Sequence, residues 1–226
     1  SISIETKDIH ECMDQLAKAS AIFMGEMYER TDEFGTIKCV DVKLFDDNLV
    51  TYSDYTDYHG DLLPGFVAVN YDWGQDEFDS QLLNIDHIAC ALRENESVLW
   101  EDYVNNIFGS DTVVELKKGQ LETSNSGMQL KLLRNVQKSI NNVLVDPDCQ
   151  MNKSQVQQFL DGNHGTGIQH IAFESEDIFE TIKALKSRGT EFVKFPDEYF
   201  DSLQENYPTL DVDKLKEHNV LCEIKD

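Results

Sequence analysis

Apolar and polar positions along the first quarter of the chain alternate in patterns typical of short strands and one amphipathic helix. Asp8–Ala19 has helical spacing, with Ile9, Met13 and Leu16 on one face and Asp8 as the expected cap. The strands predicted here are Ile2–Glu5, Ala21–Met24, Thr36–Leu44 and Leu49–Tyr55. The last two flank an acidic turn, which predicts a β-hairpin.

The pattern continues in the second half, after a polar stretch at Asp72–Ser80 that is typical of a linker. We therefore predict two domains, residues 1–80 and residues 81–226. The strands predicted in the second are Ile85–Ala89, Thr112–Glu115, Met128–Arg134, Asn142–Val145 and Glu191–Phe195, together with the His170 strand that follows the glycine-rich turn Asn163–Gly167. The predicted helices are Glu96–Ile107, Lys153–Leu160, Asp177–Arg188, Asp197–Glu205 and Asp211–His218.

An internal repeat relates the N-terminus to a segment 169 positions later. The shift superimposes identical residues, namely Glu5 on Glu174, Asp8 on Asp177, Ile9 on Ile178, Leu16 on Leu185 and Phe23 on Phe192. Because repeated supersecondary units complete each other's cores, we predict an α+β fold of paired βαβββ modules. The same shift places Ser1 opposite His170, so a ligand role of His170 would be absent from the N-terminal copy.

Charge and cysteine content narrow the classes of partner. Asp and Glu number 43 against 19 Lys and Arg, and the net charge of −24 argues against nucleic acid and anionic membrane surfaces as partners. The five cysteines form no CxxC pair, which favours reduced thiols in a cytoplasmic setting. No apolar run approaches the roughly 18 residues of a spanning helix. The sequence leaves a homo-oligomer open.

Two predicted strands carry a histidine between apolar residues. Side chains alternate along a strand, so His87 shares a face with Ala89 and His170 shares a face with Ala172, while the neighbouring isoleucines point to the core side. Taken singly, each histidine is more often a hydrogen-bonded core or rim residue. Because two such strands occur in one chain, a metal-ligand role for the two histidines is as well supported as a hydrogen-bonded role.

Several motifs of this sequence resemble those of a known protein family. The segment from Gly165 to Ala172, followed by Glu176-Asp177-Ile178 and Arg188-Gly189, is similar to the C-terminal half of 4-hydroxyphenylpyruvate dioxygenases and hydroxymandelate synthases. Ile85-Asp86-His87 resembles the first metal-ligand strand of that family, and the stretch from His59 to Phe66 resembles the end of its N-terminal domain. The resemblance covers nearly the whole chain and implies the vicinal oxygen chelate fold, with two domains of mostly antiparallel curved sheets.

The resemblance also implies a chemistry. In that family two histidines and one carboxylate hold non-haem Fe(II), which implies that His87 and His170 are metal ligands here, with an aryl 2-oxo acid and O₂ as substrates. Gln155 and Gln169 match glutamines near the family's substrate pocket, although either is equally plausible as a surface or strand-pairing residue. No residue matches the carboxylate ligand, and Glu223 lacks its sequence context. We expect that ligand beyond residue 226, in a longer protein of which this chain lacks part of the N-terminal domain and the last strands.

Departures from the family pattern bear on the substrate. Leu130 stands where the ring-hydroxylating dioxygenases usually carry serine. Val143 and Val145 stand where the family has the proline and the asparagine of a Pro-x-Asn segment. Loss of the asparagine removes hydrogen-bonding capacity. The resemblance therefore implies a product like that of hydroxymandelate synthase, with homogentisate formation in tyrosine catabolism as one alternative. A non-catalytic vicinal oxygen chelate protein that binds a small ligand is the other.

Overall fold

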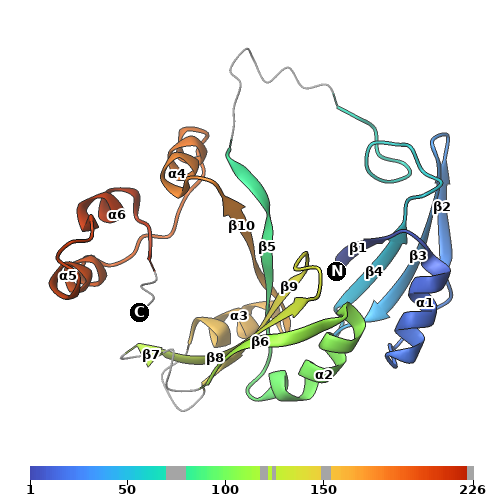
Figure 1. Cartoon of the computed structure of the whole chain (residues 1–226), viewed down its shortest axis with the longest axis horizontal. Helices are drawn as coiled ribbons and strands as arrows, with labels where there is room; N and C mark the ends of the chain where they lie inside the picture. The colour runs from blue at the N-terminus through green and yellow to red at the C-terminus, as the bar shows by residue number, and fades with distance from the viewer. Residues whose placement is uncertain (70–79, 118–121, 124–125, 149–153, 223–226) are drawn as a thin grey trace. The chain divides into compact units, whose positions relative to one another are not determined.

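A βαβββ module occurs twice in the computed structural model of the chain, which describes residues 1–69, 80–117, 122–123, 126–148 and 154–222 (Figure 1). The first module consists of β1 (Ile2–Thr6), α1 (Ile9–Lys18), β2 (Tyr28–Asp32), β3 (Gly35–Lys43) and β4 (Leu49–Asp54). The second consists of β5 (Leu82–Ala91), α2 (Glu96–Phe108), β6 (Ser110–Leu116), β8 (Ser126–Asn135) and β9 (Asn141–Pro147), with the short β7 (Glu122–Thr123) paired to β8. The remaining elements are α3 (Gln155–Asn163), β10 (Gly167–Ser175), α4 (Ile178–Ser187), α5 (Asp197–Asn206) and α6 (Val212–His218).

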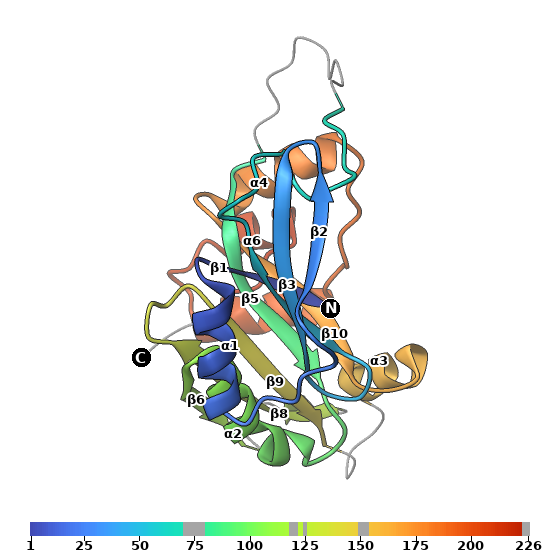
Figure 2. The ribbon, with the colours of Figure 1, turned by 90° about the vertical axis from the view of Figure 1, so that its right-hand side faces the viewer.

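The two modules share one strand order. The first sheet runs β1-β4-β3-β2 and the second runs β10-β5-β9-β8-β6, so in each module the first strand pairs with the last. That pairing is parallel in both cases, whereas β2 with β3, β3 with β4, β6 with β8 and β8 with β9 pair antiparallel. Helix α1 packs on β3 and β4, and α2 packs on β6, β8 and β9 (Figure 2). The predicted paired βαβββ modules are therefore confirmed.

The internal repeat has a structural counterpart in β10 and α4. Helix α1 spans residues 9–18, and the shift of 169 positions places it on α4, residues 178–187. Asp8 accepts hydrogen bonds from the backbone N–H groups of His10 and Glu11, as predicted for a cap. Asp177 makes the same two bonds, to the N–H groups of Phe179 and Glu180. The repeated residues thus specify a repeated strand, cap and helix.

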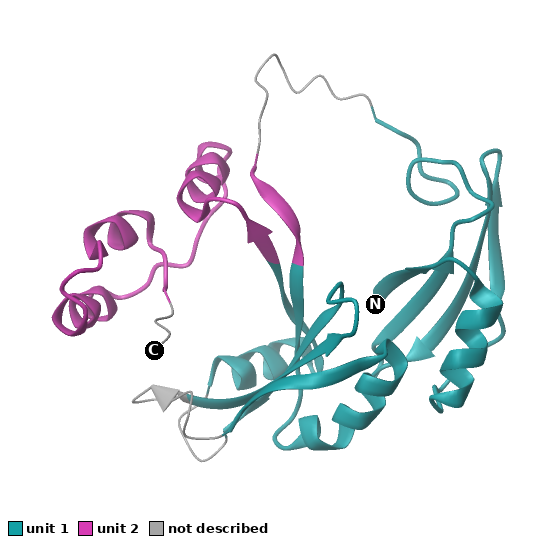
Figure 3. Cartoon of the chain, viewed as in Figure 1, with its two compact units in different colours: residues 1–71, 86–172 teal, residues 72–85, 173–226 magenta. Residues whose placement is uncertain are grey.

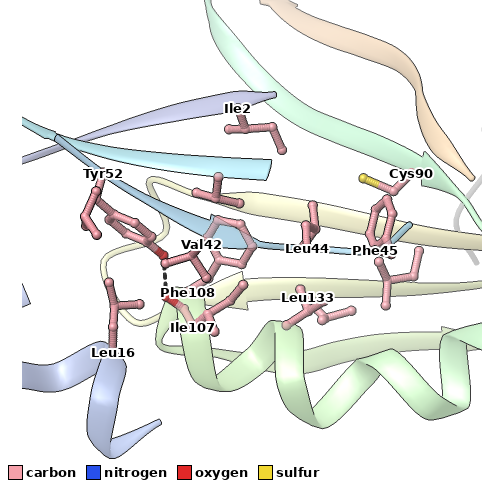
Figure 4. Close-up of a cluster of buried hydrophobic side chains, with 14 of the residues drawn as sticks. Ile2, Leu16, Val42, Leu44, Phe45, Tyr52, Cys90, Ile107, Phe108 and Leu133 are labelled. Atoms are coloured by element: carbon pink, nitrogen blue, oxygen red, sulfur yellow. Dashed lines mark hydrogen bonds between the residues drawn. The ribbon is translucent and has the colours of Figure 1, made fainter. Parts of the chain in front are cut away.

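A shared apolar core joins the two βαβββ modules (Figure 4). Val42, Leu44 and Phe45 from β3 and its following turn pack with residues of α2 and β8. Tyr52 on β4 donates its hydroxyl hydrogen to the backbone carbonyl of Ile107 at 2.5 Å, and the bond is drawn in Figure 4. Burial of this set supplies the main driving force for holding the modules together.

Two strands predicted from the sequence are not formed. Ala21–Met24 pairs with β3 only through an isolated bridge between Phe23 and Val42 and two backbone hydrogen bonds beside it, from Met24 N–H to the Asp41 carbonyl and from Lys43 N–H to the Ile22 carbonyl. Glu191–Phe195 is not a strand, because the side chain of Asn219 supplies hydrogen bonds that a neighbouring strand would otherwise make. In Glu191–Phe195, apolar alternation alone does not create a strand, because no partner backbone pairs with it among the described residues.

The chain consists of two compact units, residues 1–71 with 86–172 and residues 72–85 with 173–226 (Figure 3). The second unit has its own small core of Phe200, Leu203, Val212 and Leu215 from α5 and α6. The predicted linker lies almost wholly in residues 70–79, outside the described residues, and the division at residue 80 stays a prediction. Among the described residues, no helix combines the length and apolar character needed to cross a membrane.

Candidate metal centre

The two candidate histidines lie side by side on neighbouring strands. His87 is on β5 and His170 is on β10, which are adjacent in the second sheet. Their Nε2 atoms are 3.3 Å apart, and the ring centroids are 5.4 Å apart with the planes at 76°. The fold therefore brings together two imidazoles that are 83 residues apart in the sequence.

Each imidazole has a partner for its other nitrogen. His87 Nδ1 lies 2.7 Å from Asp86 Oδ2, and His170 Nδ1 lies 3.3 Å from Gln169 Oε1. With a proton on each Nδ1, both bonds are satisfied and both Nε2 lone pairs are free to face the same point. Burial, and to a smaller extent the neighbouring His87, lowers the pKa of His170 below its ordinary value of 6.5. The neutral form that binds metal is thereby favoured at His170.

The spacing fits one shared cation. Divalent first-row metals bind imidazole nitrogen at about 2.0–2.1 Å, which places two ligand nitrogens roughly 3.0 Å apart at a right angle and roughly 3.4 Å apart at a tetrahedral angle. The observed 3.3 Å separation of the Nε2 atoms lies in this range. Across the described residues, no group of three or more His, Cys, Asp and Glu side chains gathers as a complete metal site. Glu223, which lacks the sequence context of the family's carboxylate ligand, lies outside the described residues.

A largely buried apolar cluster lies on the same sheet face as the histidines. Val143 and Val145 on β9 are register partners of Ala89 and Ala91 on β5, and these alternate residues share the face of His87. Leu130 on β8 lies opposite Val145, so all three aliphatic residues singled out in the sequence gather here. Val156 and Leu160 of α3 pack on the same cluster. We call this set, namely Ala91, Leu130, Val143, Val145, Val156 and Leu160, the apolar wall.

The two glutamines singled out by the resemblance lie in different surroundings. Gln169 is half-buried beside His170, whose Nδ1 it faces. Gln155 is exposed at the first turn of α3. Helix α3 begins after Ser154, whose hydroxyl accepts a hydrogen bond from the Gln157 N–H. The structure thus brings Gln169, but not Gln155, into contact with a candidate ligand.

Sequence reasoning missed two supporting residues. Asp86 is the acceptor for His87 Nδ1, and its adjacency to the histidine was the available signal. Asn141 donates from Nδ2 to the Asp86 backbone carbonyl at 2.6 Å and accepts from Arg134 Nε at 2.7 Å, which no local pattern indicates. One orientation was wrong, because Ile171 is 47% exposed rather than turned into the core, whereas Ile88 does pack on the core.

The sequence of this chain is similar to those of known enzymes. Residues 104–211 match the Glyoxalase/Bleomycin resistance protein/Dioxygenase superfamily. The chain is 26% identical to 4-hydroxyphenylpyruvate dioxygenase of Xenopus tropicalis, over 99% of this chain and 58% of the relative. It is 28% identical to that of Danio rerio, over 96% of this chain and 56% of the relative. The chain thus spans less than two thirds of the length of these curated relatives.

A solved structure supports the same fold. A mutant of 4-hydroxymandelate synthase from Streptomyces coelicolor superimposes with a TM-score of 0.77 at 23% identity, over 97% of this chain and 62% of the other. At this level of identity the superposition bears on fold alone. Together with the sequence relatives, it confirms the resemblance indicated by the motifs: the chain has the vicinal oxygen chelate fold and is related in sequence to the 4-hydroxyphenylpyruvate dioxygenases.

Proposed function

We propose that this chain forms part of a non-haem Fe(II) oxygenase that acts on an aryl 2-oxo acid and O₂. The observation that carries the proposal is the convergence of His87 Nε2 and His170 Nε2 to 3.3 Å, beside the apolar wall. His87 and His170 would hold the iron, with their Nδ1 atoms held by Asp86 and Gln169. The iron, when bound, supplies the redox chemistry of oxidative decarboxylation and hydroxylation.

The apolar wall gives the protein a distinct part in this function. An aromatic ring packed on Leu130 and Val143, the partly buried members of the wall, would be shielded from water and held by dispersion contacts rather than by hydrogen bonds. These side chains carry no donor or acceptor that could fix a ring hydroxyl. We therefore favour a product like that of hydroxymandelate synthase, in which the benzylic carbon is hydroxylated. The free Cys12, Cys39, Cys90 and Cys222 of the described chain accord with the cytoplasmic setting that we propose for it.

Two other functions each have an observation in their favour. The curated relatives are named as 4-hydroxyphenylpyruvate dioxygenases, which favours homogentisate as the alternative product. The described residues contain no three-ligand cluster, which favours a protein that binds a small ligand without turnover. One experiment distinguishes the three functions: the polypeptide that contains this chain is incubated with Fe(II), 4-hydroxyphenylpyruvate and O₂. Hydroxymandelate as product supports the proposal, homogentisate supports the dioxygenase, and no oxygen uptake supports the ligand-binding protein.

Metal binding provides the direct test of the site. We expect His87→Ala and His170→Ala each to weaken Fe(II) binding, measured anaerobically, by more than about 100-fold, because losing a ligand costs more than losing an outer hydrogen-bond partner. His10→Ala, an exposed histidine on α1, is the matched control and leaves the affinity unchanged. Full Fe(II) affinity in both ligand variants would exclude the proposed site.

A further inference from the structure

Asp46 joins three segments of the chain that are distant in sequence. Its two carboxylate oxygens accept hydrogen bonds from Arg93, Oδ1 from Nη1 at 3.2 Å and Oδ2 from Nη2 at 2.7 Å. Oδ2 also accepts the backbone N–H of Thr166 at 3.2 Å. Asn48, from the same turn as Asp46, donates from Nδ2 to the Thr166 carbonyl at 3.1 Å. Paired hydrogen bonds from a planar guanidinium fix direction as well as distance.

Two of these three segments adjoin the strands that carry His87 and His170. Asp46 lies in the turn between β3 and β4 of the first module. Arg93 lies just after β5, the strand of His87, and Thr166 lies just before β10, the strand of His170. A carboxylate of the first module therefore ties the end of one histidine strand to the beginning of the other. We call Asp46, Arg93 and Thr166 the clamp.

The surroundings of the clamp hold it in place. Glu96 accepts a hydrogen bond from Arg93 Nη1 at 3.1 Å and another from the Arg93 backbone N–H at 3.0 Å. Thr166 is buried, with 2% of its surface exposed. The hydrogen bonds from Arg93 hold the pKa of Asp46 below its ordinary value, so the carboxylate is charged near neutral pH.

Gly165, in the glycine-rich turn before β10, lies directly against Asp46 and Arg93 of the clamp. Its φ of +150° lies in the region that disfavours side chains. A Cβ atom at this position would meet Asp46 Oδ2 at 3.1 Å and Arg93 Nη2 at 3.4 Å. The missing side chain thus leaves room for the clamp, which gives this glycine a physical role beyond the turn itself.

The clamp acts on the histidine pair through the paired strands. Thr166 precedes His170 by four residues, about 13 Å of extended strand. Because β5 and β10 are neighbours in one sheet, fixing β10 against the end of β5 limits sliding and twisting between them. A small change in their alignment alters the Nε2 to Nε2 distance on which shared metal binding depends.

We propose that Asp46 and Arg93 are positioning residues, which hold the His87 and His170 strands at the separation that a shared metal ion requires. The inference rests on the proposed metal site. It goes further by giving the first module a part in the site, although that module contributes no ligand to the pair. Neither Asp46 nor Arg93 touches the metal or the substrate in this proposal.

The test compares wild type with Asp46→Asn, Arg93→Lys and Asp57→Asn. Asp46→Asn removes the charge at constant size, and Arg93→Lys keeps the charge but loses the planar fork. Asp57→Asn is the matched control, because Asp57 pairs with Lys38 at 3.4 Å in the same module, away from the histidines in sequence. Each protein is titrated with Ni(II) by calorimetry, and its thermal unfolding is recorded. Hydrogen exchange at the Thr166 N–H reports directly on clamp opening.

We expect faster Thr166 exchange and Ni(II) affinity reduced by roughly threefold or more in both clamp variants, within the usual range for coupling through packed elements. The control keeps wild-type values. Wild-type Ni(II) affinity in folded clamp variants whose Thr166 exchange is faster would overturn the inference. If wild type itself binds no Ni(II), the proposed metal site fails separately. In that case the NOE between the His87 and His170 rings tests the positioning role. Loss of the NOE in the clamp variants would support that role, and persistence of the NOE would contradict it.

Discussion

Asp146 offers the clearest test of how the second module is held together. Its side chain is completely buried on β9. It accepts hydrogen bonds from the first turn of α2, and so takes the place of a capping residue although it belongs to a different element. Oδ1 accepts the Ser97 N–H at 3.1 Å, and Oδ2 accepts the Ser97 hydroxyl and Gln129 Nε2, each at 2.6 Å. Asn95, the residue at the ordinary capping position, makes no side-chain cap bond. Asp146 therefore supplies what the local sequence of the helix lacks.

The magnitude follows from the groups left without a partner. Asp146→Ala strands the backbone N–H and the hydroxyl of a fully buried Ser97, at about 1–3 kcal/mol for each unsatisfied group. Gln129 is only half-buried and can turn to water, so we expect a total loss of about 3 kcal/mol in the free energy of unfolding. Asp146→Asn keeps the size and one acceptor, and the expected loss is about 1 kcal/mol.

Urea unfolding followed by circular dichroism measures both variants against wild type. Asp102→Ala, an exposed acidic residue on the same helix, is the control and should stay within about 0.5 kcal/mol of wild type. An Asp146→Ala protein as stable as the control would refute the reasoning. A loss in Asp146→Asn equal to that in Asp146→Ala would show that charge, rather than hydrogen bonding, dominates.

The pH dependence gives a second, independent check on Asp146. Burial raises the pKa of this carboxyl above its ordinary value of 3.8, and the bonds from Ser97 and Gln129 offset only part of that effect. A raised pKa in the folded state means that its contribution to stability is fully present below the unfolded pKa of 3.8 and is lost as pH rises through the folded value. The stability advantage of wild type over Asp146→Asn should therefore shrink as pH rises above 3.8. A growing advantage would contradict the assigned burial.

Further predictions concern the repeated caps, the apolar wall and the histidines. Asp8→Ala and Asp177→Ala should each lower helix stability by about 1 kcal/mol, seen as faster amide exchange in the first turn of α1 or α4 but not in the other helix. Val145→Asn should weaken binding of an aryl 2-oxo acid by roughly tenfold, or about 1.4 kcal/mol, because it places an amide in the apolar wall; unchanged affinity in a fluorescence titration would remove Val145 from the substrate site. Because the pKa of His170 lies below 6.5, protonation of His170 should oppose metal binding only as pH drops through that lowered pKa, which a pH series of Ni(II) titrations checks.

Local chemistry in the sequence determined much of the fold. Asp8 and Asp177 precede helical apolar spacing, and their short side chains reach the first free N–H groups of α1 and α4 without help from the rest of the chain. Alternation around the acidic turn predicted the β3–β4 hairpin. These features depend on residues within a few positions of one another, so the sequence displays them.

Tertiary structure decided the rest, because it depends on groups far apart in the chain. Glu191–Phe195 has a strand-like pattern but makes its bonds to Asn219, and α2 takes its cap from Asp146 on another element. The sequence named His87 and His170 separately, but only the adjacency of β5 and β10 sets their 3.3 Å separation. The clamp through Asp46 could not be predicted at all, since one carboxylate reaches residues 47 and 120 positions away. Hydrogen-bond geometry over such separations exists only once both modules have packed.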